Sequence, residues 1–203
     1  KGEKVGLIGT TGSGKSTLID IITGLLLQQD GQLYIDDQII TAKNCRSWQL
    51  HISHVPQNIF LADTTILENI AFGVPLDEID HELVSECAKK SQISQTIESW
   101  SLKYDTLVGE RGVRLSGGQR QRIGIARALY KQTDVIIFDE ATSALDDKTE
   151  LKVIDNIFNL NPDITILIIA HRLTTLKKCN QVIELEEGRV LRSGTYKEIV
   201  GKI

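Results

Sequence analysis

Several features that mark other classes of protein are missing from this sequence. The 203 residues include no methionine, and the three cysteines, Cys45, Cys87 and Cys179, are widely spaced with no C-x-x-C pair. An odd number of separated cysteines argues against disulfides and against a zinc site, and it fits a reducing cytosol. Because the chain starts at Lys1 and lacks methionine, we expect it to be part of a longer protein.

Long apolar runs are missing as well. The longest are Val135–Phe138 and Ile166–Ala170, whereas a membrane helix needs roughly 20 consecutive apolar residues. Short runs of this kind are typical of buried strands in a parallel sheet. The sequence also has no visible signal peptide, internal repeat or low-complexity segment. The formal net charge of -4 argues against a nucleic-acid partner.

What the sequence does contain is a regular alternation of strand and helix patterns. An apolar strand at 4–9 leads through a glycine-rich turn into a helix, residues 30–40 indicate a turn and a hairpin, and 51–57 indicate a strand. Further expected elements are helices at 116–129 and 147–158 and strands at 135–138, 165–169 and 181–185. This order predicts an α/β fold with a mostly parallel, doubly wound sheet and an antiparallel β part.

Residues 64 to about 104 differ from the rest of the chain. They are polar and helical in pattern, with an amphipathic helix at 78–90 and no apolar run of the kind that forms a core strand. We interpret this stretch as a helical subdomain inserted in the α/β core. Together with the loop that follows it, the predicted subdomain covers about 64–114.

A glycine-rich segment predicts a phosphate site. Gly9–Ser16, GTTGSGKS, matches G-x-x-x-x-G-K-[ST] and stands between a buried strand and a helix, as a P-loop requires. Backbone N–H groups of such a loop turn toward phosphate oxygens, and the helix N-terminus adds partial positive charge. Lys15 would reach the β- and γ-phosphates, and the Ser16 hydroxyl would bind Mg²⁺. The alternative, a chance glycine turn, is disfavoured by these flanking elements. The predicted nucleotide-binding residues here are Gly9, Thr10, Thr11, Gly12, Ser13, Gly14, Lys15, Ser16 and Thr17.

Two carboxylates follow the apolar run at 135–138. In open α/β sheets, ligands bind outside the carboxyl ends of the strands. Asp139 would therefore hold Mg²⁺ through water, and Glu140 would polarise the attacking water as a general base. An ordinary acidic turn is the alternative, and it would be preferred if the chain had no P-loop.

Further motifs occur in the order found in one family. They are Gln57 in VPQ, LSGGQ at 115–119, SALD at 143–146 and His171 in IAHRL. With these motifs, the chain resembles the nucleotide-binding domain of an ATP-binding cassette (ABC) transporter over nearly all of residues 1–203. LSGGQ followed by a strand that ends in Asp-Glu is highly specific to this family, whereas a P-loop alone indicates only an NTPase.

The resemblance implies how these residues act on ATP and Mg²⁺. Ser116 would cap the helix that follows it, and the two glycines after it would let a γ-phosphate approach the backbone. Because the P-loop already wraps its own nucleotide, this second cradle implies a head-to-tail dimer with a second copy of the same or a similar domain. Gln57 would reach Mg²⁺ and the lytic water, and His171 would touch the γ-phosphate. The residues expected at the partner's nucleotide are Ser116, Gly117, Gly118, Gln119 and Asp146.

By the same resemblance, the chain is expected to be the ATPase of an exporter on the cytoplasmic face of a membrane. Glu110 lies in VGERG, which is similar to the loop that contacts the membrane domain in exporter-type cassettes. That domain, N-terminal strands of the β part and an adenine-stacking aromatic are expected upstream of Lys1. One alternative is a non-transport cassette acting on DNA or ribosomes, but coiled-coil heptads and a second cassette are missing. A nucleotide sensor without turnover would have no need of Glu140.

Overall fold

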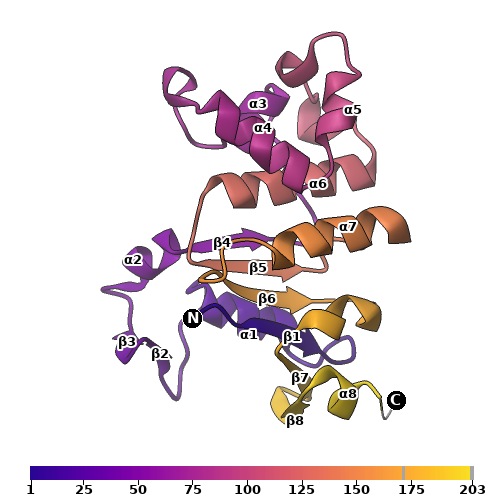
Figure 1. The fold of residues 1–203 in the computed structure, drawn as a ribbon. Helices are drawn as coiled ribbons and strands as arrows, with labels where there is room; N and C mark the ends of the chain where they lie inside the picture. The colour runs from indigo at the N-terminus through magenta and orange to yellow at the C-terminus, as the bar shows by residue number, and fades with distance from the viewer. Residues whose placement is uncertain (171, 202–203) are drawn as a thin grey trace. The chain divides into compact units, whose positions relative to one another are not determined.

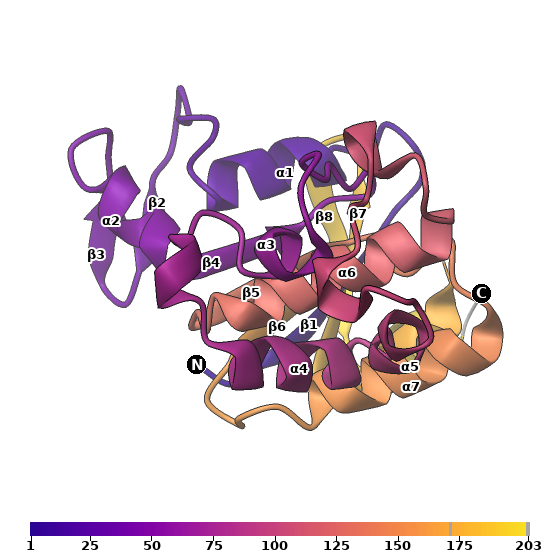
Figure 2. The same cartoon turned by 90° about the horizontal axis from the view of Figure 1, so that it is seen from above.

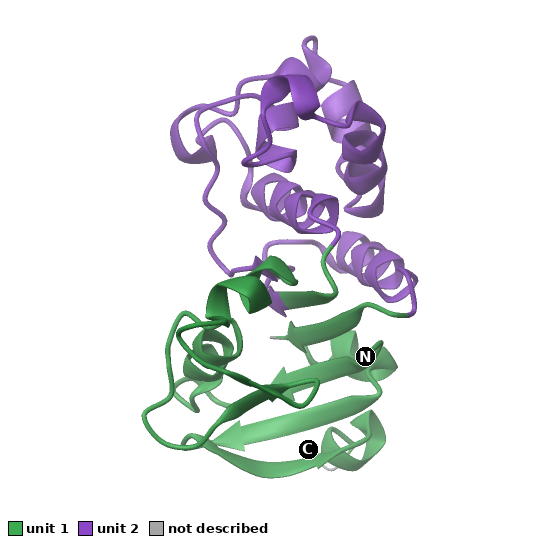
Figure 3. Cartoon of the chain, turned by 90° about the vertical axis from the view of Figure 1, so that its left-hand side faces the viewer, with its two compact units in different colours: residues 1–53, 133–137, 163–203 green, residues 54–132, 138–162 purple. Residues whose placement is uncertain are grey.

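The structure is a computed structural model that describes residues 1–170 and 172–201 (Figure 1). It divides into two compact units, which are drawn in different colours in Figure 3. Unit 1 comprises residues 1–53, 133–137 and 163–203, and unit 2 comprises residues 54–132 and 138–162. Each unit is described by itself below.

Unit 1 is built on a mostly parallel sheet (Figure 3). β1 is parallel to both of its neighbours, β6 and β7, and β7 is antiparallel to β8. The strand order is β4 (Ile52–Val55), β5 (Val135–Asp139), β6 (Thr165–Ile169), β1 (Lys4–Ile8), β7 (Gln181–Glu186) and β8 (Arg189–Gly194). The predicted α/β fold with a mostly parallel sheet is therefore confirmed.

The apolar runs of the sequence form the core of unit 1. Leu7 and Ile19 are each 1% exposed, and they pack in one cluster with buried residues of four strands. The other members of this cluster are Ile52, Ile137, Ile169 and Leu185. Burying one such side chain stabilises the fold by about 1.5–3 kcal/mol. Because Leu7 lies on β1 and Ile19 on α1 (Lys15–Ile22), the glycine-rich turn between them is anchored at both ends.

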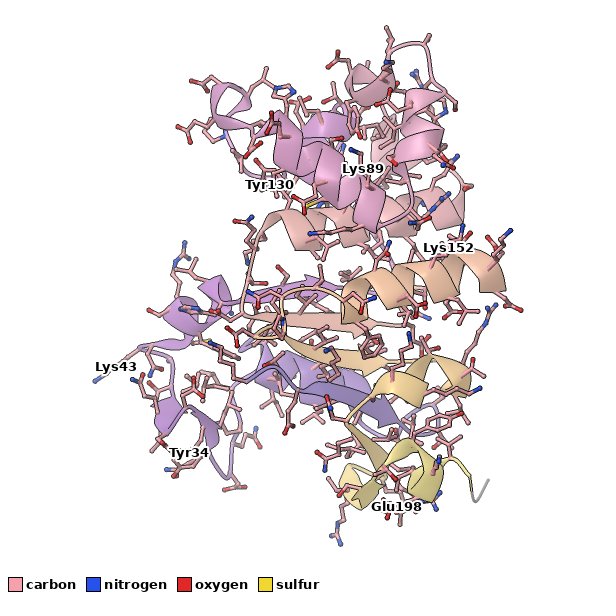
Figure 4. All side chains as sticks on the ribbon, viewed as in Figure 1. Tyr34, Lys43, Lys89, Tyr130, Lys152 and Glu198 are labelled. Carbon is pink, nitrogen blue, oxygen red and sulfur yellow. The ribbon has the colours of Figure 1, made fainter. Side chains whose placement is uncertain are left out.

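The predicted hairpin is also present in unit 1. β2 (Leu33–Ile35) and β3 (Gln38–Ile40) pair antiparallel as a separate two-stranded sheet. Asp36 and Asp37 join them with φ of 45° and 66°, the left-handed values of a two-residue hairpin turn. Tyr34 on this hairpin, labelled in Figure 4, is 55% exposed.

Four short elements of unit 1 were not predicted. α2 (Cys45–Leu50) follows the hairpin, and the Trp48 indole donates to the Ile22 carbonyl at the end of α1 over 2.7 Å. Near the C-terminus, β8 and α8 (Tyr196–Ile199) follow β7. A 3-10 helix, η4, spans Leu173–Lys178.

Unit 2 is mainly helical. α6 (Gly117–Tyr130) has α3 (Ile66–Ile70) and α4 (His81–Lys90) packed against it (Figure 2). The remaining helices of the unit are α5 (Ser94–Glu98), α7 (Asp147–Phe158) and the 3-10 turns η1 (Leu76–Glu78), η2 (Lys103–Asp105) and η3 (Glu110–Gly112).

The helix expected at 78–90 starts later than predicted. The Asp80 side chain accepts a hydrogen bond from the Leu83 amide at 2.9 Å, so the helix begins at His81. A polar residue that caps a helix in this way marks its start. The bounds of about 64–114 for an inserted subdomain stay a prediction. Among the residues that the structure describes, no helix is both long and apolar enough to cross a membrane.

Candidate functional site

The P-loop connects β1 to α1 in unit 1. The Lys15 ammonium bends back over the loop and donates to the carbonyl oxygens of Gly9 at 2.8 Å and Thr10 at 2.9 Å. The Ser13 amide also donates to the Thr10 carbonyl at 3.1 Å, which closes a turn inside the loop. Hydrogen bonds within the loop therefore fix its shape, and three of the bonding groups are the Lys15 ammonium and the carbonyls of Gly9 and Thr10.

Two positions of this loop require glycine for different structural reasons. A Cβ on Gly9 would overlap the Leu185 carbonyl oxygen of β7, so a side chain there would clash with backbone. A Cβ on Gly12 would meet no atom within 4 Å, but its φ of 83° is a conformation that residues with a Cβ rarely adopt. Gly9 is thus needed for close packing, and Gly12 for the path of the chain.

The turn between β7 and β8 supports the P-loop, and sequence reasoning missed it. The Gly188 amide donates to the Ser13 carbonyl at 2.9 Å. A Cβ on Gly14 would lie 3.3 Å from the Gly188 Cα, so the two segments are in close contact. Glu187 and Gly188 have φ of 48° and 75°, the left-handed values of a two-residue hairpin turn, and in the sequence Gly188 alone hinted at it.

The start of α1 is suited to an anion. Ser16 and Thr17, in its first turn, are exposed, so their hydroxyls are accessible. The first N–H groups of a helix lack partners within the helix and attract phosphate.

In the described part of the chain, no group of three or more His, Cys, Asp or Glu side chains is placed to hold a metal ion. Mg²⁺ commonly takes one or two protein ligands and completes its shell with water and substrate phosphates. The Ser16 hydroxyl fits that role.

In unit 2, the structure brings together two of the predicted catalytic residues. The Gln57 amide donates from Nε2 to Oε2 of Glu140 at 2.8 Å. Glu140 has φ of 49°, the left-handed region that is uncommon for a residue with a side chain. Asp139, the last residue of β5, is partly buried. Backbone strain of this kind clusters at functional sites, where the surrounding structure holds it in place.

LSGGQ forms the start of α6. The Ser116 hydroxyl accepts from the Gln119 amide at 3.2 Å, and the Gln119 side-chain oxygen accepts from the Ser116 amide at 2.8 Å. This reciprocal pair is a capping box, so the predicted cap by Ser116 is confirmed. Gly117 and Gly118 are then the first two residues of the helix.

A cavity of about 430 Å³ lies at this helix start. Its lining residues are Ser116, Gly117, Gly118, Arg122, Ala144, Leu145, Asp146 and Thr149. Asp146 caps α7 by accepting from the Thr149 amide at 3.0 Å. Hydrogen bonds from Thr149 hold the pKa of Asp146 below its usual range. The structure therefore places Asp146 beside the LSGGQ residues.

The loop at 140–146 lies against α6 through a residue that sequence reasoning missed. Gln121 is 5% exposed. Its Nε2 donates to the Ser143 hydroxyl at 3.0 Å, and its Oε1 accepts from the Ala144 amide at 2.9 Å. Nothing in the sequence pattern marked this glutamine, because its partners lie more than twenty residues away.

The backbone of Gly118 lies close to this loop, which gives a stability prediction. A Cβ on Gly118 would lie 3.0 Å from the Ala144 carbonyl oxygen and 3.3 Å from Leu145 Cδ2, whereas one on Gly117 would make an ordinary 3.5 Å contact with Ala144 Cβ. Overpacking costs about 1–3 kcal/mol. We expect Gly118→Ala to unfold at lower urea concentration than its matched control Gly117→Ala, by about 1–3 kcal/mol in the free energy of unfolding. Equal stabilities of the two variants would show that the loop moves aside to accommodate the added methyl group at no cost.

The predicted site residues fall into groups. The P-loop residues lie in unit 1, and Gln57, Asp139, Glu140, the LSGGQ residues and Asp146 lie in unit 2. Within unit 2, Gln57 meets Glu140, and LSGGQ meets Asp146. His171 lies outside the described residues.

Comparisons with known proteins agree on one family. The family model described as "ABC transporter" matches residues 1–143. An "ATP-dependent lipid A-core flippase" of Polaromonas sp. is 37% identical over 201 residues, which are 99% of this chain and 34% of the flippase. The "ABC transporter ATM1" of Toxoplasma gondii is 41% identical over 201 residues, 99% of this chain and 18% of that protein.

A solved structure shows the same fold. It is described as "Structure of a bacterial Atm1-family ABC exporter with ATP bound", and it superposes with a TM-score of 0.93 at 34% identity. The match covers 99% of this chain and 35% of the exporter chain. The chain thus spans about a third or less of the length of these similar proteins.

Proposed function

This chain belongs to the ABC transporter family, and we propose that it is the ATP-binding and ATP-hydrolysing part of a membrane exporter. In the proposal, it works head-to-tail with a second copy of the same or a similar domain. One observation is the main support. The chain has two separate glycine-rich helix starts, one at Lys15 in unit 1 and one at Gly117 in unit 2, and the second opens into a cavity. Because one nucleotide needs one P-loop, the second helix start is available to the nucleotide of a partner.

In this proposal, unit 1 binds the phosphates. Lys15 turns its ammonium from the carbonyls of Gly9 and Thr10 to the β- and γ-phosphates, and the N–H groups at the start of α1 bind phosphate oxygens. The Ser16 hydroxyl and, through water, Asp139 would hold Mg²⁺. The ion would neutralise charge on the phosphates when it is bound.

Hydrolysis is assigned to the carboxylate of Glu140. Gln57 donates to Oε2, and we assign the other oxygen, Oε1, to the attacking water. Glu140 accepts a proton from this water as the water oxygen bonds to the γ-phosphorus and the bond to the β–γ bridging oxygen breaks, which yields ADP and phosphate. The family resemblance assigns His171 to the γ-phosphate.

The relatives support a membrane partner, because they are longer transporters of which the chain matches a part. We propose that a membrane domain accompanies this chain and places it at the cytoplasmic face of a membrane. Val113, which directly follows η3 with its Glu110, is 75% exposed and is a candidate contact for that domain. Action on DNA or ribosomes is not favoured, because the similar proteins reported above are transporters.

The P-loop assignment can be tested with Lys15→Ala. Hydrogen bonds to charged groups are worth about 1.5–3 kcal/mol, so the variant should lose tight binding of ATP with Mg²⁺, by about 10- to 100-fold in Kd. A nucleotide titration measures this loss. Lys43→Ala, which removes an exposed lysine from the same unit, is the matched control and should bind as the parent does. Unchanged affinity in Lys15→Ala would remove the P-loop from the proposal.

A further inference from the structure

We propose that Gln121 is a positioning residue for hydrolysis, because it fixes the loop between Glu140 and Asp146 to the helix that begins with LSGGQ. This inference rests on the proposed function. Gln121 itself does not touch nucleotide in this proposal. It acts through Ser143 and Ala144, its two partners in the loop.

The first support is that both ends of the Gln121 amide are occupied. Its Nε2 donates to the Ser143 hydroxyl at 3.0 Å, and its Oε1 accepts from the Ala144 backbone at 2.9 Å. The side chain is 5% exposed, so water cannot readily replace either partner. A buried amide with both ends bonded has one orientation, and it fixes the groups that it binds.

The second support is that the loop between Glu140 and Asp146 is a compact series of hydrogen-bonded turns. The Ser143 amide donates to the Glu140 carbonyl at 3.1 Å, and the Leu145 amide donates to the Thr142 carbonyl at 3.0 Å. On its other side, the Thr142 hydroxyl donates to Glu150 of α7 at 2.7 Å. A shift at Ser143 is therefore transmitted through these turns to the backbone of Glu140.

The third support is that the same helix bears LSGGQ. Ser116 caps α6, and Gln121 lies on its second turn. A Cβ on Gly118 would lie 3.0 Å from the Ala144 carbonyl oxygen, so the first turn of α6 also runs close to the loop. A partner's phosphate that pulls on the start of α6 would thus act on the loop between Glu140 and Asp146. Gln121 links the recognition of the partner to the carboxylate that activates water.

The test uses Gln121→Met, which keeps the length of the side chain and removes both hydrogen bonds. Small displacements of catalytic groups cost up to about 100-fold in rate. We expect kcat for ATP hydrolysis by the purified protein to fall by about 10- to 100-fold, with the ATP Kd from a titration unchanged within about twofold. Gln95→Met, which changes an exposed glutamine in the same unit, should leave both quantities at the parent values.

A merely structural role predicts different results. Under that alternative, Gln121→Met lowers the melting temperature but hydrolyses ATP like the parent well below that temperature, and this outcome would overturn the proposal. Ser143→Ala removes one of the two partners and should lower kcat less. If Gln121 acts through Ser143, the double variant should be no slower than Gln121→Met alone, whereas multiplicative losses would contradict the route through Ser143.

Hydrogen exchange separates this inference from the proposed function. The Ala144 amide should exchange faster in Gln121→Met, since it loses its acceptor, and unchanged exchange would overturn the geometry on which the inference rests. If the parent protein hydrolyses no ATP while the Ala144 exchange responds as expected, the proposed function fails and the role of Gln121 in hydrolysis fails with it. If the parent hydrolyses ATP and Gln121→Met does too at the parent rate, only the inference on Gln121 fails.

Discussion

Glu140→Gln is expected to bind ATP like the parent but to hydrolyse it about 10²–10⁴-fold more slowly, which is the usual share of a general base. The amide keeps the size of the side chain and can still accept from Gln57, whose Nε2 bonds to Glu140 at 2.8 Å. It cannot take a proton from water. The loss should therefore be in kcat, with the affinity for ATP preserved.

The same variant should also accumulate as a closed dimer with ATP, since the proposed cycle opens the dimer only after hydrolysis. Gel filtration with and without ATP measures this shift. The matched control is Glu78→Gln, an exposed glutamate of unit 2, which should turn over like the parent and remain in the same oligomeric state. Parent-like turnover of Glu140→Gln would remove Glu140 from the mechanism.

Ser116→Arg should leave nucleotide binding to the P-loop intact and block ATP-dependent dimerisation. The arginine side chain would occupy the cavity of about 430 Å³ at the start of α6, where the proposal places a partner's γ-phosphate. Removing a fixed set of donors from a developing charge costs about 10²–10³-fold in rate, so we expect hydrolysis to fall by at least about 10²-fold. Gel filtration with ATP and a steady-state ATPase assay measure the two effects.

Two further variants separate the cavity from the cap. Ser116→Ala also removes the hydroxyl that accepts from Gln119, which should cost about 0.5–2 kcal/mol in stability, but it leaves the cavity open. It should dimerise better than Ser116→Arg. Ser101→Arg, at an exposed position of the same unit, should behave like the parent. If Ser116→Arg still forms the ATP-dependent dimer and hydrolyses ATP, the proposal that two copies share each nucleotide site is wrong.

The sequence was sufficient for the elements whose cause is local. The runs at 135–138 and 165–169 formed strands because apolar residues of that length are best buried in a sheet, and the Asp36-Asp37 turn formed a hairpin. Ser116 and its glycines indicated a capped helix start. Space for a phosphate was the sequence-based explanation of Gly118. The structure adds that a Cβ there would crowd the Ala144 carbonyl oxygen, which no local pattern contains.

The elements that were missed depend on distant contacts or on short signals that were passed over. α8 is preceded by Thr195 and has Glu198 three residues later, a capping box that the sequence displayed. α2 is held by the bond of Trp48 to the Ile22 carbonyl, and Gln121 by partners on another element, so neither could be derived from spacing. A glutamine inside a helix pattern suggests an exposed side chain, because burial of its amide is favourable only when the fold supplies both partners.

The hydrogen bonds of Lys15 to its own loop have a consequence for the thermodynamics of nucleotide uptake. The ammonium bonds to the carbonyls of Gly9 and Thr10, so the loop supplies the cation with substitutes for the phosphate oxygens. We expect uptake of a nucleotide to exchange one set of acceptors for another while the chain path between β1 and α1 stays in place. Such an exchange releases less heat than the capture of a solvated lysine by phosphate. It also costs less conformational entropy, because fewer rotatable bonds of the lysine side chain have to be fixed. Because little rearrangement of the loop would have to precede binding, we expect association of the nucleotide to be fast, which stopped-flow mixing measures.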